Sequence, residues 1–136
     1  MKLVSISIFL TLLLSNSFAN EYVVVSNKQM KNISKTQLKA IFLKKLTIID
    51  DKKLIPVNLE AKDTLRLDFE KRVLNMNFGR LKSYWTKQHY LGRRPPLSMQ
   101  SQESIKAFIK RVDGAVGYID RKNLDDDLKV LYRWKE

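Results

Sequence analysis

The chain has 136 residues, a net charge of +12, no cysteine and one histidine. This length fits one domain with one hydrophobic core. The absence of cysteine excludes disulfide bonds, lipid attachment at an N-terminal cysteine and a cysteine nucleophile. A single histidine disfavours a zinc or iron site, and His89 lies in a mixed polar and aromatic segment that is a poor setting for catalysis. We therefore expect no metal, no cofactor and no catalytic residue.

The positive charge is spread along the chain. Lysine and arginine alternate with apolar residues at helical spacing, as in 31–45 and 105–112, which is typical of the solvated outer faces of helices. The charge as a whole favours polyanions, phosphate groups or membrane surfaces as partners. The chain has no arginine-rich tail and no glycine-aromatic motif of an RNA-binding sheet, so nucleic acid is not an expected partner.

The start of the chain carries an export pattern. A lysine precedes a nearly unbroken apolar run, 3–14, and small residues stand at Ser17 and Ala19. This arrangement predicts a secretory signal peptide, 1–19, that is cleaved after Ala19. A membrane anchor is the alternative, but the run is shorter than the roughly 20 apolar residues that span a bilayer. We expect one mature domain, 20–136, in the periplasm.

The first elements of this domain are a strand, a helix and a second strand. Residues 21–26 form a β-branched run that is typical of a buried strand. A helix is predicted from Ser34, because Gln37 three residues later completes a capping box. A polar turn follows, and then a strand through Pro56. The proline places that strand at an edge of the sheet or marks its beginning.

Two further helices and a loop are predicted in the middle of the chain. Asp63 can cap the first of these helices, with Leu65 and Phe69 on its buried side. The second follows Gly79. Residues 92–102 contain two adjacent prolines, which cannot lie inside a helix, so this segment is predicted to be a loop.

Two of the four glycines lie close together near the end of the chain. The apolar residues of 105–112 recur at helical spacing, and Gly114 falls directly after the last turn, where a left-handed residue ends a helix at low cost. Gly117 lies inside a predicted strand, 115–119, where either close helix packing or an approaching ligand explains a glycine. A short helix and a last strand, 129–132, complete an alternation that predicts an α/β fold.

Four segments follow one another in a fairly specific order. They are Ile-Ser-x-x-Gln-Leu-x-x-Ile-Phe at 33–42, Arg-x-x-Phe at 66–69, Tyr-Trp at 84–85 followed by glycine and prolines, and Gly-Ala-Val-Gly-Tyr at 114–118. This order resembles the phosphate-type substrate-binding proteins of bacterial ABC transporters. The resemblance implies a single lobe of the type II periplasmic binding protein-like fold, with a mixed sheet flanked by helices. Members of that family hold their ligand between two lobes, and this chain is long enough for one.

The resemblance places an anion site at the start of the helix after the second strand. The family has a Ser-Gly-Thr turn there, whereas this chain has Asp63, Thr64 and Arg66 without a glycine. A helix N-terminus offers unpaired amides and a partial positive charge to an anion. A carboxylate at the cap competes for the same donors. We expect either that Thr64 and Arg66 contact an oxyanion such as phosphate, or that Asp63 fills the position as a structural cap.

Other residues complete the set of candidate ligand-binding positions. Ser26 and Asn27 follow the first strand, where open α/β sheets usually place ligands. Arg93 and Arg94 lie beside two prolines, and arginine forks suit phosphate oxygens, with a solvated basic loop as the alternative. Gly117 is included as a position that a ligand could approach closely.

These patterns favour a non-catalytic binding protein over an enzyme. The leading hypothesis is an exported domain that binds phosphate or a similar oxyanion and presents it to a membrane transporter. The alternative keeps the fold without the ligand. In that case the domain is a periplasmic interaction or sensor-input module that docks on a membrane partner through its basic face.

The export pattern gives a first testable expectation. The mature protein is expected to begin at Asn20 or within two residues of it, because Ser17 and Ala19 are the small residues that signal peptidase reads. N-terminal sequencing of the exported protein measures this directly. Retention of residues before Ser15 would show an uncleaved anchor instead.

Overall fold

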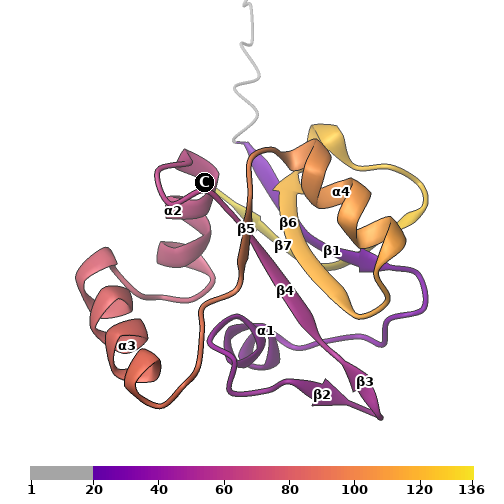
Figure 1. The fold of residues 1–136 in the computed structure, drawn as a ribbon. Coiled ribbons are helices and arrows are strands. Elements are labelled where there is room, and N and C mark those ends of the chain that lie inside the picture. The colour runs from indigo at the N-terminus through magenta and orange to yellow at the C-terminus, as the bar shows by residue number, and fades with distance from the viewer. Residues whose placement is uncertain (1–19) are drawn as a thin grey trace, which may run out of the picture.

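The computed structural model describes residues 20–136, so the predicted signal peptide lies outside the described part of the chain. A five-stranded mixed sheet with flanking helices forms its centre (Figure 1), which confirms the predicted α/β class. No helix in this part is long and apolar enough to cross a bilayer. In chain order the elements are β1 (Glu21–Asn27), α1 (Lys35–Phe42), β2 (Ile48–Ile49), β3 (Lys52–Lys53), β4 (Ile55–Leu59), α2 (Thr64–Arg72), α3 (Phe78–Tyr90), β5 (Leu97–Met99), α4 (Gln102–Arg111), β6 (Ala115–Asp120), a 3-10 helix (Arg121–Asn123) and β7 (Leu128–Lys135).

The direction of the strands decides which residues meet at each end of the sheet. The strand order is β5-β4-β6-β1-β7. β4 runs parallel to both of its neighbours, β5 and β6, whereas β1 runs antiparallel to β6 and β7. In this register Val25 lies opposite Gly117, and Ile55 lies opposite Ala115. The carboxyl end of β1 therefore lies at the same end of the sheet as the start of β4, opposite the carboxyl end of β4.

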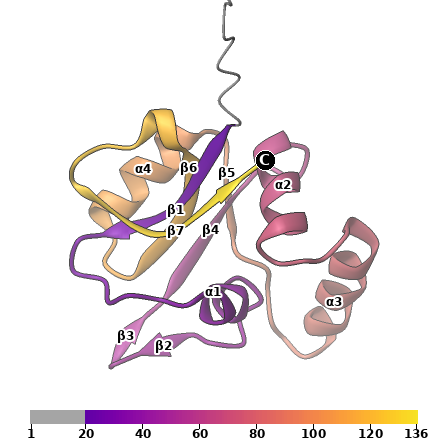
Figure 2. The same ribbon diagram turned by 180° about the vertical axis from the view of Figure 1, so that it is seen from behind.

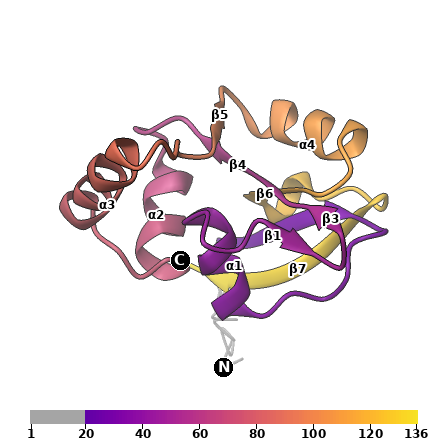
Figure 3. The same cartoon turned by 60° about the horizontal axis from the view of Figure 1, so that its bottom comes forward.

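The two faces of the sheet are covered by different helices. α4 lies on one face, and α1 and α2 lie on the other, as the view from behind in Figure 2 and the turned view in Figure 3 show. Successive side chains of β6 divide between these faces, as strand geometry requires. Gly117 faces Ile105 of α4, and the next residue, Tyr118, faces Phe69 of α2.

An aromatic cluster fills the core on the α1/α2 face. The ring of Tyr118 stacks on that of Phe69, with 4.1 Å between centroids and 13° between planes. Phe42 of α1 meets Phe69 edge to face at 4.7 Å. Trp134 of β7 lies 5.7 Å from Phe69. These contacts bring two helices and two strands together in one buried group.

The polar atoms of this cluster are all hydrogen-bonded. The hydroxyl of the fully buried Tyr118 donates to Asn58 Oδ1 at 3.0 Å and accepts the backbone N–H of Leu59 at 3.2 Å. Burial raises the pKa of Tyr118 far above its ordinary value, so the phenol stays neutral and can donate. The indole N–H of Trp134 donates to Asp68 of α2 at 2.8 Å. The cluster therefore adds no unpaired buried group to the core.

The predicted capping box of the first helix is confirmed. The hydroxyl of Ser34 accepts the N–H of Gln37 at 3.1 Å, and the Gln37 side chain accepts the N–H of Ser34 at 2.9 Å. α1 begins directly after it, at Lys35.

β4 lies inside the sheet, so the expectation that Pro56 marks an edge strand is wrong. The other expectation is confirmed, because β4 begins at Ile55. The N–H of Ile55 points to the β6 side and bonds Gly114 O at 2.9 Å. The nitrogen of Pro56 therefore faces the β5 side, where pairing begins only at Val57. The missing N–H of the proline removes no ladder bond there.

The predicted loop 92–102 contains a short strand, β5, that sequence patterns missed. β5 has three residues and begins directly after the two prolines. So short a strand shows no alternation of its own, and its pairing with β4 is what defines it. The last strand is longer than the predicted 129–132, because β7 pairs with β1 along its whole length.

The helix before β6 ends earlier than its pattern indicates. α4 ends at Arg111, and Val112 follows in an extended conformation. Gly114 has the expected positive φ, 84°, but it forms the turn into β6 and does not end the helix. A Cβ atom on Gly114 would lie 2.0 Å from the carbonyl oxygen of Lys53. Glycine is required here both by the backbone angle and by the close approach of β3.

Substitution of Gly114 tests this turn. Gly114→Val is expected to lower the free energy of unfolding by more than about 2 kcal/mol, because it combines a left-handed β-branched residue with a backbone clash. Arg111→Ala, at a nearby exposed position, is expected to change it by less than about 0.5 kcal/mol. Urea unfolding of both variants measures the difference. Equal midpoints would contradict the turn described here.

Candidate functional site

The predicted ligand-binding residues lie at two opposite ends of the sheet. Asp63, Thr64 and Arg66 follow the carboxyl end of β4, at the start of α2. Ser26 and Asn27 lie at the carboxyl end of β1, which is antiparallel to β6 and so reaches the other end of the sheet. The sequence did not show that β1 is reversed relative to β4. The two groups cannot contact one small ligand.

At the start of α2, Asp63 acts as a helix cap. Its carboxylate accepts the N–H of Leu65 at 2.8 Å, which occupies one of the donors that a bound anion would use. Thr64 is exposed at the first position of the helix. Asp63 therefore has the geometry of a structural helix cap, which is one of its two expected roles. An anion bound at this position would have to displace the Asp63 carboxylate.

The side chain of Arg66 is mostly buried and lies against the end of β4. Its Nη1 donates to the carbonyl oxygen of Leu59 at 2.8 Å. Its Nε lies 3.4 Å from Glu70 Oε1, which is an ion pair, but this buried nitrogen makes no hydrogen bond. Both side chains of the pair are less than one-fifth exposed. Arg66 therefore ties α2 to the end of β4.

The pair between Arg66 and Glu70 is a structural one. Burial raises the pKa of the Glu70 carboxyl, and the nearby charge of Arg66 opposes this shift. Removing Arg66 would leave a largely buried carboxylate without its partner and a buried carbonyl without its donor. Arg66→Ala consequently perturbs folding and is not a clean test of anion binding.

Ser26 and Asn27 form a junction at the other end of the sheet. Ser26 is fully buried, and its hydroxyl donates to the carbonyl oxygen of Asn27 at 2.9 Å. The Asn27 amide donates to Asp113 Oδ1 at 3.0 Å, and Lys52 reaches the same oxygen at 3.0 Å. The hydrogen bond from Asn27, followed by that from Lys52, lowers the pKa of Asp113. These contacts join the end of β1, β3 and the turn after α4.

The two arginines after α3 differ in their contacts. Arg93 Nη1 donates to the side chain of the buried Gln88 at 3.1 Å. Arg94 is exposed and has no ion pair within residues 20–136. Arg93 is therefore partly held by α3, whereas Arg94 matches the alternative of a solvated basic loop.

Gly117 lies in close contact with α4. A Cβ atom on this residue would lie 2.6 Å from Ile105 Cγ2 and 3.2 Å from Ile109 Cδ1. Gly117 is buried, and its φ is not in the left-handed region. Close packing of α4 on β6, the first of the two explanations expected for Gly117, accounts for this glycine.

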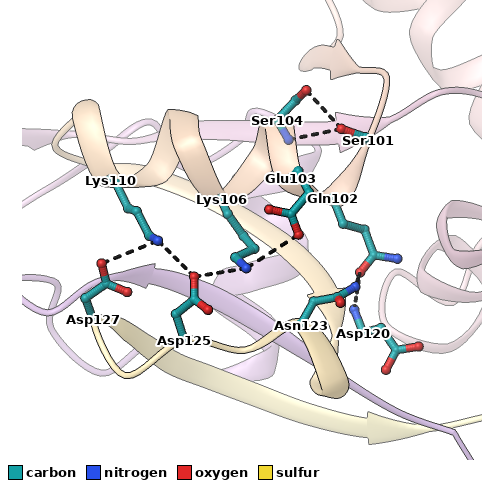
Figure 4. Close-up of polar contacts among 10 residues, drawn as sticks. All are labelled: Ser101, Gln102, Glu103, Ser104, Lys106, Lys110, Asp120, Asn123, Asp125 and Asp127. Carbon is teal, nitrogen blue, oxygen red and sulfur yellow. Dashed lines mark hydrogen bonds and ion pairs between the residues drawn. The ribbon is translucent and has the colours of Figure 1, made fainter.

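A network of charged residues holds α4 to the loop before β7 (Figure 4). Asp125 accepts hydrogen bonds from Lys110 at 2.8 Å and pairs with Lys106 at 2.9 Å. Asp127 and Glu103 lie at the two ends of this network, next to Lys110 and Lys106 respectively. Lys110, then Lys106, lowers the pKa of Asp125. Every charge in this network has a partner, which indicates a structural role.

Within the described range no group of three or more histidine, aspartate or glutamate side chains lies close enough to hold a metal ion.

Two solved structures share this fold. One is the crystal structure of an ABC-type phosphate transport receptor from Vibrio cholerae, with a TM-score of 0.65 and 20% identity over 82% of this chain and 45% of that chain. The other was assigned as a phosphate ABC transporter substrate-binding protein with bound phosphate, from Clostridium perfringens, with a TM-score of 0.66 and 19% identity over 83% of this chain and 45% of that chain. No family model matches this chain, and no curated protein matches it.

These comparisons define the fold and its extent. The chain spans less than half the length of each receptor. The five-stranded mixed sheet with its flanking helices matches the periplasmic binding protein fold, which confirms the predicted fold class. At about one residue in five identical, the likeness carries the fold alone.

The pKa of Asp125 gives a prediction for acid stability. A carboxyl whose pKa is lowered by folding stabilises the protein above its unfolded pKa of about 3.9. This contribution is lost as the pH falls through the lower folded value. Asp125→Asn is therefore expected to be less stable than wild type near neutral pH, and the difference is expected to vanish in strong acid. Asp126→Asn is the control, because Asp126 is an exposed neighbour that pairs with no cation in residues 20–136.

Urea unfolding at a series of pH values measures both variants against wild type. A stability difference for Asp125→Asn that stays constant from neutral to strongly acidic pH would contradict the role of its ion pairs.

Proposed function

We propose that this protein is an exported, non-catalytic binding domain that recognises a small oxyanion such as phosphate. The observation that carries the proposal is the match of its fold, over more than four-fifths of the chain, to two proteins described as phosphate receptors. The net charge of +12 supports an anionic ligand. The fold match therefore suggests phosphate as the ligand by analogy, and the positive net charge of the protein favours a negatively charged ligand.

The proposal needs no catalytic group. Solute binding requires donors and shape complementarity, whereas catalysis requires a positioned acid, base or nucleophile. The groups of this chain whose pKa is shifted, such as Glu70, Asp113 and Asp125, have structural partners.

The start of α2 is the position at which the family likeness would place the ligand. The backbone amide of Leu65 there donates to the carboxylate of Asp63, and Thr64 is the first residue of the helix. An oxyanion must compete with this carboxylate. A single lobe also surrounds less of a ligand than a two-lobed cleft does. We expect weak binding at this position in the wild-type protein.

The second candidate function is a periplasmic interaction or sensor-input module without a small ligand. The cap formed by Asp63 and the inward contacts of Arg66 favour it, because both residues are engaged within the protein. Such a module would dock on a transporter or sensor in the membrane through basic surface.

Titration with phosphate separates the two functions. Asp63→Ser is expected to bind phosphate at least about tenfold more tightly than wild type, because it removes a competing negative charge and keeps a hydroxyl at the cap. Asp126→Ser removes one negative charge from an exposed position elsewhere and is expected to bind like wild type. Isothermal calorimetry at low salt measures all three proteins.

If neither wild type nor Asp63→Ser releases or absorbs heat on titration with millimolar phosphate, oxyanion binding at the start of α2 is contradicted. An equal gain in Asp63→Ser and Asp126→Ser would show a general effect of charge and would leave the interaction module as the better function.

A further inference from the structure

A groove lies between α1 and α3, away from the start of α2. It has a volume of about 350 Å³ and none of its lining residues belongs to α2. Its walls carry the charged side chains of Lys39 and Lys45, from α1 and the turn after it, and of Arg80 and Lys87, from α3. No carboxylate lines the groove. Four cations therefore share one hollow.

None of these four cations forms an ion pair with another described residue. Within residues 20–136, every ion pair of the protein is made by other basic residues. Lysines elsewhere do pair, as Lys106 and Lys110 do with Asp125 (Figure 4). Other exposed cations, such as Lys62 and Arg111, also lack an ion pair within residues 20–136. The groove differs from those positions because four such cations line one cavity.

The distribution of acidic residues along the chain explains this. Neither 22–49, which contains α1, nor 71–102, which contains α3, has a single aspartate or glutamate. Both walls of the groove come from these two acid-free segments. Like charges that share a hollow repel each other, and a bound anion relieves that repulsion.

The two walls are held at a fixed spacing. The hydroxyl of Tyr84, on α3, donates to the carbonyl oxygen of Leu43 after α1 at 2.6 Å. The ammonium group of Lys45 lies 5.7 Å from the centre of the Tyr84 ring, over its face. On α3 the lining residues Arg80, Ser83 and Lys87 recur at helical spacing, so they share one face. A groove with walls fixed in this way loses little entropy when it binds a ligand.

We propose that this groove binds an anion that carries at least two phosphate groups. The negative charge of one phosphate group would balance only part of the positive charge of the four cations. The charge of two phosphate groups comes close to balancing all of it. The arginine fork suits a bidentate contact with phosphate oxygens, the lysines act as point charges, and the Ser83 hydroxyl adds a neutral donor. The groove shares no residue with the start of α2, so this inference does not rest on phosphate binding there.

Calorimetric titration with inorganic pyrophosphate at low salt tests the groove. The groove variant is Arg80→Gln with Lys87→Gln. The matched control is Arg111→Gln with Lys28→Gln, which removes the same two kinds of charge from exposed positions outside the groove. We expect affinity to fall at least about tenfold in the groove variant and less than about twofold in the control. Circular dichroism confirms that both variants are folded.

A second arm identifies the source of the phosphates. Vesicles of phosphatidylcholine with and without cardiolipin, a lipid whose headgroup has two phosphates, are sedimented with the three proteins. Binding to pyrophosphate that the groove variant loses indicates a soluble ligand. Binding to cardiolipin vesicles alone, again lost in the groove variant and kept in the control, indicates a lipid headgroup.

The inference is overturned if wild type binds neither probe, or if the groove variant and its control lose binding equally. These outcomes are distinct from failure of the proposed function. Phosphate binding that responds to Asp63→Ser but not to the groove variant would uphold the proposed function alone. Pyrophosphate binding lost in the groove variant, without any response to Asp63→Ser, would uphold the groove alone.

Discussion

The stacked rings of Tyr118 and Phe69 fix the position of the helices on one face of the sheet. Tyr118 is anchored at its far end by hydrogen bonds to Asn58 and Leu59 of β4, so its ring cannot shift along the sheet. Phe69 belongs to α2 and stacks on Tyr118. Phe42 belongs to α1 and packs edge to face against Phe69. A change in this contact is expected to disturb the packing of both α1 and α2, because closely packed interiors leave little space to absorb it.

The same contact determines the chemistry at the start of α2. With Phe69 held on Tyr118, the first turn of α2 lies beside the end of β4, and Arg66 reaches the Leu59 carbonyl. The guanidinium group donates to that carbonyl and balances the charge of the partly buried Glu70. The position at which a helix N-terminus usually receives an anion is thus capped by Asp63 and lacks an outward-facing arginine. Asp63 and Arg66, two ligand-binding candidates from the sequence, thus make structural contacts within the protein.

Local patterns predicted local features well, whereas nonlocal pairing was beyond them. The capping box at Ser34 and the cap at Asp63 depend on residues within one turn, and both are observed. The interior position of β4, the strand β5 and the packing role of Gly117 depend on neighbours distant in sequence. The groove between α1 and α3 belongs to the second kind. Its one sequence signal was the absence of acidic residues from two segments whose contact the sequence did not reveal.

The distribution of charge on this single lobe follows from where its acidic residues are used. Asp125 and Asp127 neutralise the lysines of α4, Asp113 neutralises Lys52, and Glu70 neutralises Arg66. Those acids lie on or beside the α4 face, at the end of β1, and within the core contact of α2. The outer surfaces of α1 and α3 receive none, and Tyr84 joins these two helices directly. Part of the unbalanced charge, on Lys39, Lys45, Arg80 and Lys87, therefore lines a groove between two helices that Tyr84 holds together. An anion bound in the groove would balance these cations, as Asp125 balances Lys106 and Lys110 of α4.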